Sequence, residues 1–442
     1  MIEPETIYAL SSGLGRAGIA VVRVSGPQAK FIVEAVAGPL PKPRLMGLRQ
    51  LKSRDGLEVI DQALVLWMPG PSTVTGEDVA EFHVHGSPVV VSRLFVELAK
   101  FENVRPAEAG AFTRRAFENG RMDLLEVEGL ADLLSANTDS QRRLAMRQFL
   151  GEASDVYESW RTQLLSALAL LEASIDFVEE DDVVARAWKQ VRPIVDNLVV
   201  ELAAALDSAS RAGAVRDGLR LVIAGPPNVG KSSLLNKLVG RDAAIVSALA
   251  GTTRDVVEAA IDFEGVALLL ADTAGLRSET TDEIERIGMN KTSERLRDAD
   301  IVVWVIAPDV ADEVGPNRAV DLFVLNKADM LKPDSIHTRN DSFLAVSTRT
   351  GLGMTALFDQ LREIVRARSF LGNQAIIVRD RHIVAVKETI RLLNESLKNE
   401  GRPLEVIAED VRNAALALGS VTGRIGVEDL LGKIFSEFCI GK

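Results

Sequence analysis

One stretch of this 442-residue sequence limits its possible folds more than any other. Residues 225–232, GPPNVGKS, follow the apolar run LRLVIA and precede the helical pattern SLLNKL. In this context the backbone N–H groups of a glycine-rich loop and of a helix N-terminus can surround a phosphate. Lys231 can reach the β- and γ-phosphates, and Ser232 can bind Mg²⁺. The stretch therefore predicts a P-loop nucleotide-binding domain.

Later motifs indicate which nucleotide is bound. NKAD, at residues 326–329, follows the apolar run DLFVL, and VSTRTG follows FLA. The Asp329 carboxylate can accept hydrogen bonds from guanine N1–H and N2–H₂, which are donors that adenine does not offer. DTAG, at residues 272–275, follows VALLLA, so Asp272 can hold the Mg²⁺ shell and the Gly275 N–H can contact the γ-phosphate. GTTRD lies between the P-loop and DTAG and offers a switch threonine. The order of the motifs predicts a GTPase.

The residue after DTAG bears on how the nucleotide is hydrolysed. Ras-like proteins place a glutamine there to orient the attacking water, but this chain has Leu276, which cannot do so. Asn228, inside the P-loop, could instead ligate a monovalent cation beside the phosphates; it could also only brace the loop. A carboxylate of the segment DEIERIG could position the water, or the segment could be a solvated acidic helix start.

The sequence pattern divides the chain into four segments. Residues 1–120 mix strands such as GIAVVRVSG, DQALVLWM and DVAEFHVHG with helices, and residues 121–217 have helical periodicity. Residues 218–369 alternate short apolar runs with helical patterns, which is typical of a doubly wound, mostly parallel sheet. Residues 370–442 return to helical periodicity. We therefore expect a multidomain α/β plus α protein, in which a Ras-like GTPase domain is inserted into a helical domain.

The composition and charge of the chain limit the partners and the cellular compartment that we expect. The formal net charge of −12 argues against a broad nucleic-acid-binding surface. Arg142, Arg143 and Arg147 could still form a local basic patch, although a solvated helix face is the simpler interpretation. One cysteine, Cys439, excludes a disulfide framework and a cysteine-based zinc site. Residues 1–18 do not resemble a leader sequence, and no apolar run reaches the ~18 residues of a membrane span. The expected location is the cytoplasm, with no membrane partner.

Further motifs extend the pattern over essentially the whole chain. They are GRAGIAVVRVSGP, TGEDVAEFHVHG, FTRRAFENGRMDL, IDFVEED, ERIG and the final CIGK. In this order, and with the nucleotide motifs, the chain resembles the MnmE/TrmE family of tRNA-modifying GTPases. The resemblance implies an N-terminal α/β tetrahydrofolate-binding domain that mediates homodimerisation, followed by the helical domain with its inserted G domain.

The resemblance also implies a reaction. In complex with the flavoprotein MnmG (GidA), which alone carries FAD, such a protein adds an aminomethyl or carboxymethylaminomethyl group to C5 of the wobble uridine of certain tRNAs. The carbon comes from 5,10-methylenetetrahydrofolate or 5-formyltetrahydrofolate. K⁺-dependent meeting of two G domains stimulates GTP hydrolysis. A ribosome-assembly or signalling switch GTPase with an N-terminal docking domain is the alternative, and a dimer scaffold with an incidental GTPase cycle is a third.

The resemblance assigns roles to individual residues. Asn228, Ser247, Leu249 and Thr252 would bind K⁺, Ser232 and Thr253 would bind Mg²⁺, and Glu285 of ERIG would position the water. The catalytic candidates are Glu285, Asn228, Asp272 and Cys439. The GTP-contacting candidates are Asn228, Val229, Gly230, Lys231, Ser232, Ser233, Ser247, Ala248, Leu249, Ala250, Gly251, Thr252, Thr253, Asp272, Thr273, Ala274, Gly275, Asn326, Lys327, Asp329, Ser347, Thr348 and Arg349.

A folate site is implied as well. Its candidates are Arg23, Glu81, Arg121 and Lys442, with lysine being usual in the family where this chain has Arg121. A carboxylate such as Glu81 can hold the amide and amine edge of a pterin, and the anionic glutamate tail favours arginine or lysine. Cys439 could then be a nucleophile or proton-transfer group for the one-carbon unit, or a lining residue. His83 and His85 are expected to be structural.

Overall fold

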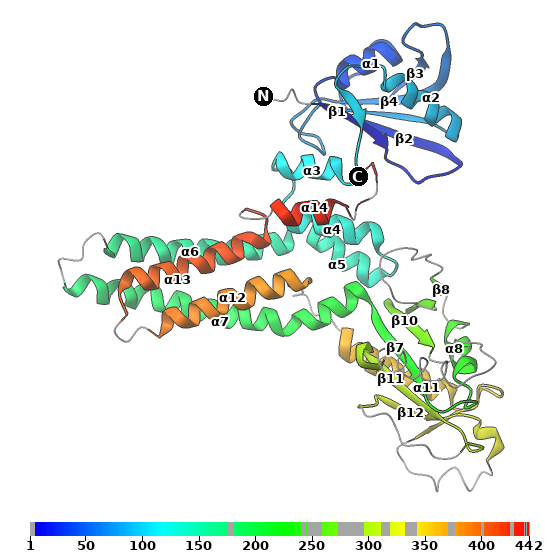
Figure 1. Cartoon of the computed structure of the whole chain (residues 1–442), viewed down its shortest axis with the longest axis vertical. Helices are drawn as coiled ribbons and strands as arrows, with labels where there is room; N and C mark the ends of the chain where they lie inside the picture. Colours follow the sequence, from blue (N-terminus) through cyan, green and yellow to red (C-terminus); the bar gives the residue numbers. More distant parts are fainter. Residues whose placement is uncertain are drawn as a thin grey trace, which may run out of the picture. The chain divides into compact units, whose positions relative to one another are not determined.

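The computed structural model describes most of the chain, in two compact units (Figure 1). The first unit comprises Met1–Ala131, Phe149–Glu158 and Leu418–Lys442, and the second comprises Asp132–Gln148 and Ser159–Ala417. The described residues are 5–175, 181–240, 244–245, 259–272, 296–310, 319–331, 343–369, 376–398, 402–424, 428–436, 438 and 440–441, with only the backbone described at 181–187, 244–245, 271–272, 428–430 and 433.

The first unit is built on a six-stranded sheet with the order β3-β4-β5-β2-β1-β6. Neighbouring strands are antiparallel except for β1 and β6, which are parallel. The strands expected at GIAVVRVSG, DQALVLWM and DVAEFHVHG are confirmed as β2, β4 and β5. The six strands are β1 (Thr6–Leu10), β2 (Ala17–Ser25), β3 (Gly47–Lys52), β4 (Val59–Met68), β5 (Val79–Gly86) and β6 (Val104–Pro106).

Alternation along these strands separates a core face from an open face. Val22 and Phe82 are fully buried with residues of α1 (Ala29–Ala37) and α2 (Pro88–Leu98). Arg23, one residue after Val22, must point to the opposite face because successive side chains alternate across a strand. The open face therefore carries polar groups such as Arg23, beside a small buried apolar cluster that includes Ala9 and Phe112.

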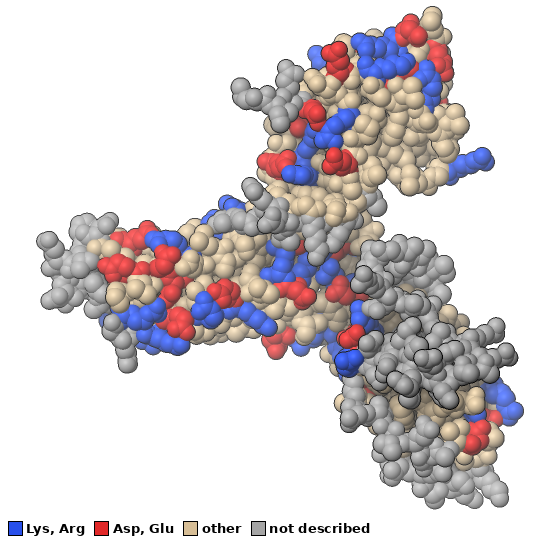
Figure 2. Space-filling model, viewed as in Figure 1, with Lys and Arg blue, Asp and Glu red and all other residues tan. Residues whose placement is uncertain are grey.

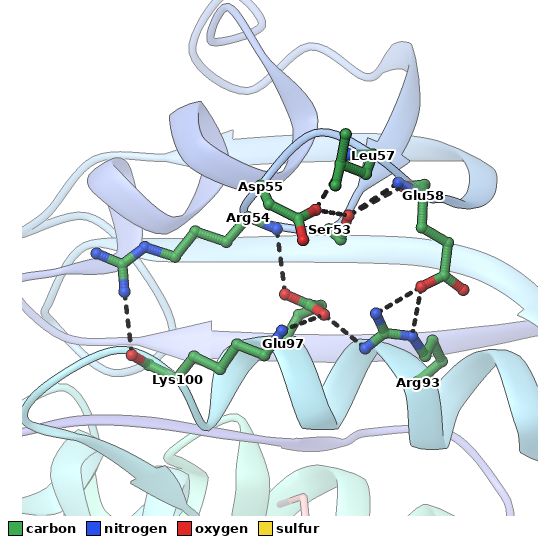
Figure 3. Close-up of polar contacts among 8 residues, drawn as sticks. All are labelled: Ser53, Arg54, Asp55, Leu57, Glu58, Arg93, Glu97 and Lys100. Atoms are coloured by element: carbon green, nitrogen blue, oxygen red, sulfur yellow. Dashed lines mark hydrogen bonds and ion pairs between the residues drawn. The ribbon is translucent and has the colours of Figure 1, made fainter.

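A buried carboxylate attaches the β3–β4 turn to α2 (Figure 3). Glu97 is fully buried and accepts hydrogen bonds from the Arg54 amide at 3.1 Å and from Lys100 Nζ at 2.7 Å, with Arg93 Nη1 at 2.5 Å. Burial alone would raise the pKa of Glu97, but these three donors outweigh it and hold the pKa below its usual value. The turn is therefore held to the helix by an ionised group.

The C-terminal end of the chain lies against the N-terminal strand of the same unit. α14 (Glu428–Ser436) contributes Phe435 to a small core with Leu124, and Phe438 joins that core. Ile440 forms an antiparallel bridge with Ala109, and Ser11 Oγ donates to the Gly441 carbonyl oxygen at 2.8 Å. The tail is thus docked at its described residues rather than frayed.

Long helices form one part of the second unit. The helical periodicity expected for residues 121–217 and after 370 is confirmed, with α7 and α12 running alongside each other (Figure 1). Among the described helices, none combines the length and apolar character that crossing a membrane requires. α7 (Asp181–Asp217) and α12 (Asp380–Leu397) lie wholly in the second unit, and α3 (Ala111–Glu118) lies wholly in the first. α4 (Leu124–Ser135), α5 (Asp139–Phe149), α6 (Glu152–Ile175) and α13 (Leu404–Val421) have residues in both units.

A seven-stranded sheet forms the rest of the second unit, with the order β13-β12-β11-β7-β10-β9-β8. Pairs among β13, β12, β11, β7 and β10 are parallel, and β9 and β8 are added antiparallel. The four domain limits expected from sequence remain predictions. The elements are β7 (Leu219–Ala224), α8 (Lys231–Val239), β8 (Ala244–Ile245), β9 (Ala259–Phe263), β10 (Val266–Asp272), β11 (Ile301–Ile306), β12 (Leu322–Leu325), η1 (Ala328–Met330), β13 (Leu344–Ala345) and α11 (Met354–Ser369).

One carboxylate, that of Asp132, contacts an arginine on each side of this sheet in the sequence. Arg216 lies just before β7, and Arg379 lies just before α12. Asp132 Oδ1 is 3.3 Å from Arg216 Nε and 2.6 Å from Arg379 Nη2. Arg216, which precedes the sheet in sequence, and Arg379, which follows it, therefore meet at the Asp132 carboxylate.

Candidate functional site

The predicted P-loop connects β7 to α8 and needs its glycines. Gly225 has φ 146° and Gly230 has φ 93°, a region that L side chains rarely adopt. A Cβ on Gly225 would overlap the Val305 carbonyl oxygen, and one on Gly230 would overlap the Asn326 side-chain amide. Asn228 also has a positive φ, 62°, which asparagine tolerates better than most residues. The loop leaves a backbone cradle of the kind that holds phosphate.

Lys231 places a cation in this loop. It is the first residue of α8, and its Nζ donates to the carbonyl oxygens of Gly225 at 2.9 Å and Pro226 at 2.7 Å. Val229 is buried in the core, whereas Ser232 and Ser233 are exposed in the first turn of α8. Anions are favoured at a helix N-terminus, so both the loop and Lys231 offer positive potential at the same point.

Asn326 joins the NKAD segment to the P-loop. It follows β12 and is almost fully buried. Its Nδ2 donates to the Val229 carbonyl oxygen at 2.9 Å, and its Oδ1 accepts from the Thr348 amide at 3.3 Å. Lys327 has φ 58°, and its Nζ lies 2.7 Å from Asp309 Oδ2. The two loops at the carboxyl edge of the parallel strands therefore share one hydrogen-bonding centre.

Asp329 is an ionised acceptor beside these loops. Its Oδ1 accepts from Ser347 Oγ at 2.6 Å, and its Oδ2 lies 2.7 Å from Arg349 Nη2. The Ser347 hydrogen bond, with the charge of Arg349, lowers the pKa of Asp329 below its usual value. Thr350 donates its amide to Ser347 Oγ at 3.1 Å and so orients the hydroxyl. The carboxylate keeps its charge at neutral pH and can accept from a donor pair such as N1–H and N2–H₂ of guanine.

Several predicted nucleotide residues lie outside the described residues. They are Ser247, Ala248, Leu249, Ala250, Gly251, Thr252, Thr253, Thr273, Ala274, Gly275 and Glu285. For Asp272 only the backbone is described, at the end of β10, where it pairs with Ile223 of β7. This register brings the start of DTAG beside the strand that leads into the P-loop.

A second group of predicted residues meets on the open face of the first unit's sheet. Arg23 of β2 lies opposite Glu81 of β5, with Arg23 Nε and Nη2 3.0 and 2.9 Å from Glu81 Oε1. His83 Nε2 is 3.2 Å from Glu81 Oε2. The Arg23 guanidinium lies 5.6 Å from the Phe112 ring centre, a cation–π distance. The structure thus adds His83 to the residues around Glu81. The period-2 alternation of β5 could have indicated this, because it puts residues 81 and 83 on the same face.

The other predicted folate residues lie at a turn and at the tail. Arg121 is exposed in the turn after α3. Lys442 and Cys439 lie outside the described residues, but their neighbours Ile440 and Gly441 contact Ala109 and Ser11. Ser11 follows β1, and Leu10 of β1 pairs with Val22, the residue before Arg23. The described tail residues therefore lie at the end of β1, the strand that pairs with β2.

The arginine-rich face of α5 is partly neutralised. Arg142 Nη2 and Arg143 Nη2 lie 2.8 and 3.2 Å from the Asp139 carboxylate. Figure 2 shows basic and acidic side chains interspersed on the viewed face, without one broad basic area. A solvated helix face accounts for these arginines better than a nucleic-acid-binding patch does.

Comparisons with known proteins agree along the whole chain. Residues 6–121 match a family described as GTP-binding protein TrmE N-terminus, and residues 124–439 match the MnmE helical domain. A protein of Beijerinckia indica subsp. indica named tRNA modification GTPase MnmE is 46% identical, over 99% of this chain and 96% of its own length. Proteins of the same name from Bradyrhizobium sp. (strain ORS 278) and Methylobacterium sp. (strain 4-46) are each 45% identical over 99% of this chain, and over 99% and 100% of their own lengths.

Proposed function

Because the chain belongs to the MnmE family of tRNA modification GTPases, we propose that it hydrolyses GTP as part of a tRNA-modifying complex. In that complex it would act as a homodimer with the flavoprotein MnmG (GidA), which holds the FAD. The product would be an aminomethyl or carboxymethylaminomethyl group at C5 of a wobble uridine. A tetrahydrofolate derivative would supply the carbon.

The single observation that carries the nucleotide part is the Asn326 connection. The Asn326 side chain donates to the Val229 carbonyl oxygen of the P-loop and accepts from the Thr348 amide. The ionised Asp329 belongs to the same NKAD segment. A phosphate-binding loop and a donor-seeking carboxylate at one sheet edge suit a nucleotide with an anionic tail and a guanine edge. GTP meets both requirements, whereas ATP meets only the first.

The described residues also suit the ions that GTP hydrolysis requires. Ser232 would hold Mg²⁺, and Asn228 would hold K⁺ through its side-chain oxygen. Their predicted co-ligands, Thr253 for Mg²⁺ and Ser247, Leu249 and Thr252 for K⁺, lie outside the described residues. Bound cations neutralise charge that develops on the phosphate oxygens. Lys231 adds a positive charge beside the phosphates. Because Leu276 stands where Ras-like proteins have a water-orienting glutamine, Glu285 would orient the water instead.

On the first unit, Arg23 and Glu81 suit a reduced folate. Both groups sit half-buried on a sheet face, where a carboxylate can accept from the amide and amine edge of a pterin. Arg121 and Lys442 would hold the anionic glutamate tail. Cys439 would line the one-carbon unit or take part in its transfer.

Mass spectrometry of tRNA from a strain that lacks this gene tests the proposal. We expect the wobble-uridine modification to disappear and to return with the wild-type gene. An unchanged profile would reject the tRNA-modifying function and favour a switch GTPase with a docking domain. For the ion, hydrolysis by the purified chain is compared in K⁺ and in Na⁺, and equal rates would reject the role of Asn228.

A further inference from the structure

Three sequence motifs of the first unit meet at one arginine that the proposed function does not use. Arg115 lies in α3, within FTRRAF. Its Nη1 donates to Glu77 Oε2 at 2.7 Å and to the Ser25 carbonyl oxygen at 3.0 Å, and its Nη2 donates to the Glu5 carbonyl oxygen at 2.7 Å. Ser25 ends β2, Glu5 directly precedes β1, and Glu77 of TGED lies two residues before β5. The guanidinium therefore connects the helix to segments at the ends of three strands.

The acceptors of Arg115 are themselves held. Ser25 Oγ donates to Glu77 Oε2 at 2.8 Å and lies 2.7 Å from Thr75 Oγ1. Ser25 and Thr75 are fully buried, and the Arg115 side chain is only 16% exposed. Hydrogen bonds between charged groups are stronger and more directional than neutral ones, and burial shields them from water. The segment around residues 75–77 is therefore a fixed platform.

The turn that carries Arg121 rests on this platform. Asn119 Nδ2 donates to the Thr75 carbonyl oxygen at 2.7 Å, and the Arg121 amide donates to the Ala116 carbonyl oxygen at 2.7 Å. A Cβ on Gly76 would lie 2.8 Å from Asn119 Cβ and 3.3 Å from Arg121 Cγ, so the turn lies directly against this glycine. Arg115 and Arg121 are thus linked through the loop that Arg115 anchors.

We propose that Arg115 is a positioning residue, which orients the Arg121 guanidinium toward the glutamate carboxylates of a reduced folate. The inference rests on the proposed folate site. Arg115 would act through the protein, because three of its N–H groups donate to Glu77, Ser25 and Glu5 and its side chain is only 16% exposed. An exposed arginine loses rotamer freedom when it binds an anion. A turn that is already fixed removes the further cost of ordering the backbone beneath Arg121.

The neighbouring arginine offers a matched control. Arg114 has the same charge and the same helix, but its contact is with Glu118 at 2.8 Å on the helix surface, and its side chain is 55% exposed. Arg114→Gln should therefore leave folate binding unchanged, whereas Arg115→Gln should weaken it.

The test is calorimetric binding of two probes to the full-length protein: 5-formyltetrahydrofolate, and the matching 5-formyltetrahydropteroate, which lacks the glutamate. We expect Arg115→Gln to weaken binding of the folate about tenfold, because a displaced Arg121 loses its charge-assisted contact with the glutamate tail, and to change binding of the pteroate less than about twofold. The double variant Arg115→Gln/Arg121→Gln should bind the folate no more weakly than Arg121→Gln alone, because residues that act through one contact are not additive.

Other outcomes separate the inference from its premise. Equal weakening of both probes, or additive effects in the double variant, would overturn the positioning role. If Arg115→Gln does not fold, as judged by thermal unfolding and GTP hydrolysis, Arg115→Lys and Glu77→Gln replace it with the same expectations. If the wild-type protein binds neither probe, the folate site itself is wrong and the inference is rejected with it.

Discussion

The two candidate sites of this protein are built in opposite ways. The nucleotide site of the second unit consists of short loops at one edge of a parallel sheet, and its cradle is mostly backbone. The proposed folate site of the first unit lies on the face of a mainly antiparallel sheet and consists of side chains, with Arg23 from β2 beside Glu81 from β5. The difference predicts that the phosphate cradle of the first site is most sensitive to changes in backbone geometry, and that the second site is most sensitive to changes in its side chains.

The strongest test of this contrast is a substitution that affects only backbone space. Gly225→Ala adds a Cβ that overlaps the Val305 carbonyl oxygen at φ 146°. We expect GTP affinity to fall by at least about a thousandfold, since a displaced loop loses several phosphate contacts at once. A fluorescent GTP analogue measures this loss. Gly213→Ala, which has open space around its Cβ, is the control, and unchanged affinity in Gly225→Ala would contradict the backbone argument.

The next test changes chemistry without changing shape at the nucleotide site. Asp329→Asn replaces an ionised acceptor by an amide that also donates. GTP affinity should fall about a hundredfold, because one of the two guanine donors loses a charged acceptor. Affinity for xanthosine triphosphate should rise, since its C2 carbonyl accepts from the new amide. Competition titrations with both nucleotides measure the switch, and Arg349→Gln, at an 81% exposed side chain, should have a small effect. A parallel loss for both nucleotides would mean that Asp329 does not contact the base.

Glu81→Gln tests the side-chain character of the folate site. It removes the charge that Arg23 and His83 hold, and the amide can no longer accept through both oxygens. We expect binding of 5-formyltetrahydrofolate to weaken about thirtyfold, with GTP hydrolysis in K⁺ unchanged. Calorimetry and phosphate release measure the two effects. Glu118→Gln, on the surface of α3, serves as the comparison, and equal losses in both variants would remove Glu81 from the site.

The smallest expected effect is a shift in pH dependence. The pKa of Asp329 is lowered first by the Ser347 hydrogen bond and then by Arg349, so its contribution to GTP affinity persists below the ordinary carboxyl pKa of about 3.9 and is lost as pH falls through the lowered pKa of the folded protein. Ser347→Ala should move this acid limb to higher pH. Affinity measured from about pH 7 down to the onset of unfolding checks it, and coincident acid limbs would argue against the Ser347 contribution.

More of the nucleotide site than of the folate site could be predicted from the sequence, and the reason is physical. The strands β2, β4 and β5 and the helices were readable because their periodicity is local. The P-loop was readable too, because Gly225, Gly230 and Lys231 act within a few residues. His83 was assigned only a structural part, although it lies beside Glu81. The anchoring role of Arg115 was not visible, because its partners Glu5, Ser25 and Glu77 lie far from it along the chain.

By itself, the sequence determined the chemistry of the nucleotide loop, the kinds of elements and the family. These depend on residues close together in the chain, whose backbone conformations are set by local sterics. Only the tertiary structure decided that Arg23 meets Glu81, that Gly441 reaches Ser11, and that Asp132 contacts both Arg216 and Arg379. Strand register and long-range packing set these contacts, and neither can be read from spacing alone.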